Sequence, residues 1–527
     1  MVDVASNDSA HHSMLDPDDA RHLEREETDE APLAKAPSME HTEGIDSSFS
    51  PSLWHRFRAD IVHLKWRVLV LMCLTPYGSY YFYDVPGAIG TGKGATIQRH
   101  FLDGGEHYDQ DMNLLHYSIY GYINVAMAFV WGVLIEKYLG LRKTFLIGTG
   151  TVAVAAALFW IGVITRSYGL MVTARVVFGM AGESITVAQG AMVSRWFRDG
   201  VAFPLGWTIA LLRVAAGSTF YFSPLAANNW SVGGACFLAF VFGVFSFAMA
   251  ASLAFVDRQA ERRGDVAVET VAANSSLRLL DVILLPKQVV LISVISMLLY
   301  GALWPFLNVA VNFFEVKYNT HEDSAGGYVA IYQAASAIGS PLLGFFVDRT
   351  GRFTHWFVVS GLGLALVHVL FLVTNPPIVL MMLMFALFYS SLQASVWPVL
   401  PWAVPFTLIG VAFGLETSLF NLGVAVQPTI FGAVLTHHTN ASNVRRNPQT
   451  GDLEPPLPSL AGYNITLVIM ICTALLAVVV TAVLCIVDRG GVLAVSVAER
   501  TSILSLRTEA MAARQETEAL DMEMSEQ

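Results

Sequence analysis

Two oppositely charged residues, Glu183 and Arg213, lie inside long apolar runs of the sequence. A lone charge at the centre of a membrane costs at least about 2.5–3.5 kcal/mol, so each needs a partner or a water-filled cavity. A carboxylate can bind an ammonium group, and a guanidinium can bind a carboxylate through two parallel hydrogen bonds. The two side chains therefore either neutralise each other as a structural salt bridge or bind opposite ends of a zwitterion. They could also alternate, paired when the site is empty and parted by the substrate.

The helices that carry these residues place them at similar depths. Glu183 lies in a predicted helix over 169–193, which ends near Ser194, and Arg213 lies in the next predicted helix, 202–226. With a rise of about 1.5 Å per residue, both residues are roughly 16–18 Å from the cytosolic ends of their helices. We therefore expect both to lie near the midplane of the membrane.

The composition is that of a membrane protein. Of the 527 residues, 54% are hydrophobic and only 14% are charged, whereas soluble domains carry about 25% charged residues. Apolar runs close to the ~20 residues needed to cross a bilayer recur along the chain, and a spanning backbone that satisfies its own hydrogen bonds is helical. We predict an all-α membrane protein with twelve transmembrane helices, at 66–87, 113–135, 144–164, 169–193, 202–226, 232–256, 288–311, 325–346, 355–374, 377–400, 406–434 and 461–487.

Charge and polarity divide the chain into tails and halves. Residues 1–50 carry a net charge of −10 and residues 490–527 a net charge of −4. Both ends lack apolar periodicity, which indicates disordered tails, and the positions of the basic loops place both tails in the cytosol. The predicted divisions are an acidic tail at 1–55, a six-helix half at 56–256, a cytosolic linker at 257–287, a second six-helix half at 288–488 and a C-terminal tail at 489–527.

A repeated motif supports the two halves. GVLIEKYLGLRK (132–143) and GFFVDRTGR (344–352) each contain a glycine, three apolar residues, an acid, a base, and then a second glycine and a base. We expect the first glycine of each copy to allow close helix approach. The charged residues are expected to form a cytosolic cluster that favours one packing of the neighbouring helices. The residues concerned are Gly132, Glu136, Arg142, Gly344, Asp348, Arg349 and Arg352.

The repeated motif resembles the loop signature of the major facilitator superfamily, whose two halves are related by an axis along the membrane normal. ARVVFG (174–179) resembles that superfamily's fourth-helix motif, which favours a scaffold role for Arg175 over substrate contact. RVVFGMAGESITVAQ and RVAAGST are similar to the corresponding segments of a family of lysosomal dipeptide transporters within the superfamily. YFYDVPGAI, FFEVKYN, ASVWPVL and GVAFGLETSLFNLGVA agree with the same family, so the resemblance covers nearly all of 66–487.

The resemblance implies a uniporter that moves dipeptides by alternating access. The family's dipeptide-binding acid and arginine fall on Glu183 and Arg213. Tyr83 either contacts the substrate or shapes the luminal end of the first helix, and Trp397 either lines the cavity or packs in the core. Glu416 departs from the family, which has an uncharged residue there. It is either a neutral, hydrogen-bonded core acid or a proton- or cation-coupling site.

Other classes of protein have less support. The sequence has no P-loop, nucleophile elbow or metal-ligand spacing, so we expect no enzyme activity, cofactor or bound metal. Basic segments do not alternate with aromatic residues as they do on a nucleic-acid surface. The alternatives to a dipeptide carrier are a carrier for another organic anion, such as a monocarboxylate, and a non-transporting receptor or scaffold. Glu183 disfavours the anion carrier, because an anion needs no acidic partner.

Signals for processing and sorting are sparse. Asn229 and Asn440 lie in sequons on the luminal side and are glycosylation candidates. The resemblance implies a lysosomal or other endomembrane location, but the N-terminal tail lacks the family's dileucine signal, which leaves the plasma membrane open. Glu499, Ile503 and Leu504 in the C-terminal tail could replace that signal. The partners implied are dipeptides, the lipid bilayer and a glycosylated, single-span luminal accessory protein.

Overall fold

The structure, a computed structural model, describes most of the chain between residues 64 and 493. All described residues belong to one compact unit, Ile61–Gln527. Apart from two short strands they form helices and their connections, which confirms the predicted all-α class. The described ranges are 64–197, 202–266, 285–404, 409–439, 445–446, 453–488 and residue 493.

Eleven helices in these ranges are long and apolar enough to cross a membrane, which makes this a multi-pass membrane protein. Each corresponds in order to a predicted span. A notable difference is that α8 continues through residues assigned to the linker. The helices are α4 (Gln110–Leu134), α5 (Gly140–Ile164), α6 (Tyr168–Trp196), α7 (Ala202–Asn229), α8 (Val232–Arg263), α9 (Lys287–Tyr318), α10 (Glu322–Thr350), α11 (Phe353–Val373), α12 (Ile378–Ala403), α13 (Ile409–His437) and α14 (Leu460–Val487).

The first predicted span, 66–87, is not one continuous helix. Residues 64–74 are helical, Thr75 and Pro76 form a turn, and α2 (Tyr77–Ile89) follows. Proline has no backbone N–H, so Pro76 leaves the carbonyl four residues earlier without its helical partner. Neither piece is among the eleven helices long enough to cross a membrane, so the twelfth span stays a prediction.

Side chains from α6 satisfy the carbonyls that two prolines free in this first span. The Gln189 amide donates to the Met72 carbonyl at 2.8 Å, in place of the N–H that Pro76 lacks. Pro86 frees the Phe82 carbonyl in the same way, and Arg175 Nη2 donates to it at 3.2 Å. Unbonded backbone groups are costly in hydrocarbon. Arg175 therefore acts on the scaffold, in agreement with the role that the fourth-helix motif favours.

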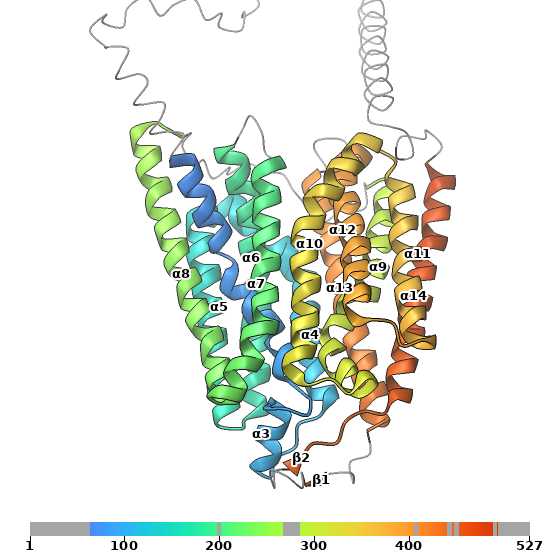
Figure 1. Cartoon of the computed structure of the whole chain (residues 1–527). Helices are drawn as coiled ribbons and strands as arrows, with labels where there is room; N and C mark the ends of the chain where they lie inside the picture. Colours follow the sequence, from blue (N-terminus) through green and yellow to red (C-terminus); the bar gives the residue numbers. More distant parts are fainter. Residues whose placement is uncertain are drawn as a thin grey trace, which may run out of the picture. The chain divides into compact units, whose positions relative to one another are not determined.

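The helices form two groups that meet along two main interfaces. In Figure 1, α5 to α8 lie on one side of the described unit and α10, α11, α12 and α14 on the other. Across the boundary, α4 packs along α13 and α7 packs along α10. Gly326 of α10 lies so close to the Phe220 carbonyl of α7 that an added Cβ would overlap it. Small residues thus let the two predicted six-helix halves approach closely.

Polar contacts join the halves at the end opposite the basic loops, which the positive-inside rule assigns to the lumen. The Lys93 N–H donates to Glu315 Oε2 at 3.0 Å, and Lys93 Nζ donates to Asn319 Oδ1 at 2.8 Å. Asn312 Nδ2 donates to Thr91 Oγ1 at 2.9 Å. We call these five residues the luminal contacts. They hold the two halves together on the luminal side.

Three short elements were not expected from the sequence. They are α3 (Ile97–Asp103) and the antiparallel pair β1 (Arg445–Arg446) and β2 (Leu453–Glu454). Thr96 caps α3 by accepting the Arg99 N–H at 3.3 Å. All three lie at the same end of the described unit (Figure 1). These elements are too short to show an apolar periodicity in the sequence, so they could not be predicted from it.

Candidate functional site

Glu183 lies near the middle of α6 and is partly buried. Tyr120 of α4 donates its hydroxyl to Glu183 Oε1 at 3.4 Å, which is long for an O–H donor. Within the described ranges the carboxyl group forms no ion pair. Its charge therefore has no cationic partner among the described residues.

Arg213 lies on α7 and is 6% exposed. Its guanidinium carbon is 4.7 Å from the ring centroid of Tyr389 on α12 and 5.3 Å from that of Trp304 on α9. No described carboxylate forms an ion pair with it, and its Nε has no hydrogen-bond partner in the described ranges. Cation–π contacts hold a guanidinium by its face and leave its N–H groups available. Arg213 can therefore bind a carboxylate.

Aromatic rings lie between the two charged groups. The ring centroid of Tyr83, on α2, is 5.0 Å from that of Tyr120 and 5.7 Å from that of Trp304. Tyr80, on the same helix, lies within electrostatic range of both charged residues. The structure thus places the predicted Tyr83 between the surroundings of the acid and those of the arginine. It does not join the acid and the arginine in a direct salt bridge.

Trp397 and Glu416 lie in the second half. The Trp397 ring stacks on Phe413, with centroids 6.0 Å apart and planes 12° apart, which is a packing contact between α12 and α13. Glu416 is fully buried, and its Oε1 accepts the Ser296 hydroxyl at 2.6 Å. Its Oε2 has no partner among the described residues. These contacts resemble those of a core acid, whereas its use in coupling stays a prediction.

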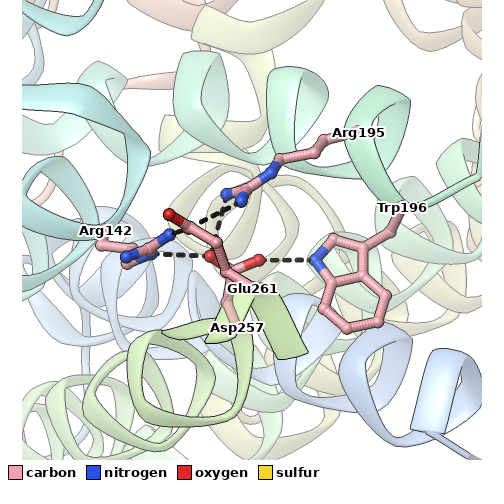
Figure 2. Close-up of polar contacts among 5 residues, drawn as sticks. All are labelled: Arg142, Arg195, Trp196, Asp257 and Glu261. Carbon is pink, nitrogen blue, oxygen red and sulfur yellow. Dashed lines mark hydrogen bonds and ion pairs between the residues drawn. The ribbon is translucent and has the colours of Figure 1, made fainter. Parts of the chain in front are cut away.

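A charge cluster lies at the ends of α5, α6 and α8 that the positive-inside rule assigns to the cytosol (Figure 2). The buried Asp257 accepts from Arg142 Nε at 2.7 Å, Arg195 Nη1 at 2.9 Å and Trp196 Nε1 at 2.8 Å. Glu261 forms ion pairs with both arginines. The two acids were assigned to the linker. Their four-residue spacing directly after an apolar helix is the signal that indicates one helical face.

The repeated motif is visible in the backbone. Its second glycines, Gly140 and Gly351, have φ values of 70° and 66° and each follows a helical segment. Glycine adopts this left-handed region without the strain other residues incur. The first glycines behave differently from our expectation. No described heavy atom lies within 4 Å of a Cβ built on Gly132 or Gly344, so the expected close helix approach is absent in this conformation.

The structure shows no contact between the remaining predicted residues that it describes and either the Glu183 and Arg213 site or the charge cluster. Arg349 and Arg352 are exposed. Asn229 is the exposed last residue of α7 and donates to the Leu225 carbonyl at 2.8 Å, and its glycosylation stays a prediction. Outside the described residues lie Asn440, Glu499, Ile503, Leu504 and the side chains of Glu136 and Asp348.

An acid and a guanidinium that are buried in a membrane and not paired with each other can bind a small molecule carrying both charges. Two six-helix halves that meet around such residues define a membrane carrier. The Major Facilitator Superfamily model matches residues 107–428, and the chain belongs to this superfamily of transporters.

Within the superfamily the chain is similar to proteins named lysosomal dipeptide transporter MFSD1, which confirms the family resemblance. The Mus musculus protein is 30% identical over 386 residues, or 70% of this chain and 79% of the relative. The Danio rerio protein is 30% identical over 408 residues, or 73% and 84%. The nucleoside transporter NupG shares the fold, with a TM-score of 0.58 and 14% identity over 81% of this chain and 99% of that structure.

Proposed function

We propose that this protein moves dipeptides across the membrane of a lysosome-like compartment by alternating access. Glu183 binds the ammonium group of the substrate and Arg213 binds its carboxylate, and the aromatic rings between them surround the rest. One observation carries the proposal: the two opposite charges share a set of aromatic neighbours and are not paired with each other. The names of the relatives support both the substrate class and the compartment.

The ends of the substrate decide between this proposal and an anion carrier. A monocarboxylate would engage Arg213 alone and leave Glu183 without a cation in the membrane, at a cost in free energy. A dipeptide zwitterion satisfies both groups. Its binding through the backbone termini leaves the two side chains unspecified, so the proposal concerns dipeptides as a class.

Uptake of labelled dipeptide by proteoliposomes tests the proposal. Glu183→Gln and Arg213→Met each remove a charge-assisted hydrogen bond, worth roughly 1.5–3 kcal/mol, so each should weaken substrate affinity about tenfold or more. N-acetylation of the dipeptide should weaken binding to the wild type but matter little to Glu183→Gln. C-amidation should show the same pattern with Arg213→Met.

A matched double variant separates this proposal from a structural salt bridge. If the two groups only neutralise each other, the single variants should misfold and the double variant should recover expression and transport. A well-expressed double variant that moves dipeptides at the wild-type rate would end the proposal. Preferential uptake of monocarboxylates would favour the anion carrier. Copurification of a single-span glycoprotein from the native membrane would test the accessory protein.

A further inference from the structure

Three buried polar groups of the second half lie near Arg213 and have no hydrogen-bond acceptor in the described ranges. They are the Trp304 indole N–H on α9, the Tyr332 hydroxyl on α10 and the Tyr389 hydroxyl on α12. The side chains of Tyr332 and Tyr389 are fully buried. Buried polar groups are rarely left unbonded, because each costs about 1–3 kcal/mol. Three of them from three helices around one arginine therefore call for a common partner.

The geometry places these groups beside the guanidinium. Arg213 lies over the faces of Tyr389 and Trp304, at 4.7 and 5.3 Å. The Tyr332 ring centroid is 5.8 Å from that of Tyr389, and Tyr332 lies within electrostatic range of Arg213. The guanidinium belongs to the first half and the three other groups belong to the second half. They therefore meet at the boundary between the halves.

The chemistry of these groups selects the kind of atom that can satisfy them. Arginine and the indole nitrogen can only donate hydrogen bonds, and a tyrosine hydroxyl can donate one. A single partner for all of them must therefore accept several hydrogen bonds and carry negative charge. A carboxylate does both, with two oxygens and about four acceptor positions. An ammonium group would meet donors and a positive charge here, and is excluded from this end.

We propose that Trp304, Tyr332 and Tyr389 complete a subsite with Arg213 for the C-terminal carboxylate of the substrate. This inference rests on the proposed function. The subsite implies that the two ends of the binding site differ in which half of the protein supplies their residues. The ammonium end is built by Glu183 and Tyr120 of the first half, with Glu416 of the second half within electrostatic range, whereas the carboxylate end takes hydrogen-bond donors from both halves. A bound carboxylate therefore draws α7 toward α9, α10 and α12 and favours closure of the halves around the substrate.

Phenylalanine variants test the subsite, because they delete a hydroxyl and keep the ring that contacts Arg213. The affinities of wild type, Tyr332→Phe and Tyr389→Phe are measured for one dipeptide and for its C-amidated form. Each variant should lose about tenfold in affinity for the free dipeptide, as expected for a hydrogen bond to a charged group. Each should change less than twofold for the amide. Tyr81→Phe is the matched control, because the Tyr81 hydroxyl already contacts Ser223 at 3.0 Å and should not discriminate between the ligands.

The outcomes separate the two proposals. If the wild type binds dipeptides in an Arg213-dependent way but both tyrosine variants leave the ratio of the two affinities unchanged, the subsite is wrong and the proposed function stands. If the wild type binds neither ligand, both are wrong. Thermal melting of each purified variant identifies any that fail to fold. In that case Trp304→Phe, which removes the indole N–H, must show the selective loss or the subsite is rejected.

Discussion

The two acids of the charge cluster differ in burial, so they should contribute differently to the stability of the protein. The Asp257 side chain is fully buried and receives three hydrogen bonds, whereas that of Glu261 is 19% exposed. Removing one partner of a buried ion pair costs about 3–5 kcal/mol, because it strands the other charge, and partial exposure to water lowers that cost toward the ~1 kcal/mol or less of a fully exposed pair. Asp257→Ala should therefore lower the melting temperature of the purified protein much more than Glu261→Ala. Equal shifts would contradict the assignment of Asp257 as the centre of the cluster.

The contacts of Glu416 favour a structural role over coupling. The carboxyl group is buried and held by Ser296 at 2.6 Å, with no cation in contact among the described residues. Glu416→Gln keeps an acceptor for that hydroxyl. We expect uptake in proteoliposomes to respond to an imposed pH gradient as the wild type does. A flattened response with binding intact would instead make Glu416 a coupling site, and Ser296→Ala, which keeps the acid, is the control.

Single side chains could be predicted only where the sequence makes them conspicuous. Glu183 and Arg213 stand out because a charge inside an apolar run is costly. Tyr332 and Tyr389 do not stand out, because aromatic residues are frequent in membrane helices and these two meet Arg213 only across the boundary between the halves. Contacts between residues this far apart in the chain follow from packing, which a single sequence does not specify.

The helices themselves were predictable, because apolar length is a direct requirement of the bilayer. The predicted helix bounds are wrong at two places, where local chemistry matters more than the length of the apolar run. Pro76 breaks the first span, and α8 extends past its apolar segment because Asp257 and Glu261 find buried partners in α5 and α6. In the first case a missing backbone N–H, which Gln189 compensates, interrupts the helix, and in the second the ion pairs stabilise a polar extension that ends at the left-handed Gly264.

The contact between α7 and α10 offers a test at the level of helices. Gly326 faces the Phe220 carbonyl with no room for a Cβ, whereas no described atom lies within 4 Å of a Cβ on the adjacent Gly327. Gly326→Val should push the two helices apart and cost roughly 1–3 kcal/mol by overpacking. Gly327→Val should be nearly neutral for packing. Crosslinking yield between cysteines on α7 and α10 should fall in the first variant only, and a fall in both would point to a general effect on helix α10.

Closure of the luminal end concerns the molecule as a whole. The luminal contacts link Lys93 and Thr91 of the first half to Glu315, Asn319 and Asn312 of the second. An alternating-access carrier must break such contacts to open this side. Glu315 is fully buried. The free energy of these hydrogen bonds therefore helps to set the fraction of molecules that are open to the lumen.

Removing the Glu315 carboxyl group should shift that equilibrium. Glu315→Ala loses the acceptor of the Lys93 N–H, and leaving that donor unbonded costs roughly 1–3 kcal/mol, so the luminally open fraction should rise about tenfold. A single cysteine at Ala425, which is fully buried against Gly121 at the boundary, reports the opening through its rate of labelling from the luminal side. The native cysteines are first replaced, since Cys472 and Cys485 are exposed.

Thr165→Ala is the control for this labelling, because among the described residues the Thr165 hydroxyl bonds only to the Ile161 and Gly162 carbonyls of the preceding helix, α5. Labelling should accelerate in Glu315→Ala and stay at the parental rate in Thr165→Ala. A dipeptide at saturating concentration should slow labelling in both, because a carboxylate shared by the two halves favours the closed arrangement. If Glu315→Ala leaves the labelling rate unchanged, the luminal contacts do not determine closure, and the packing of α4 on α13 must supply it.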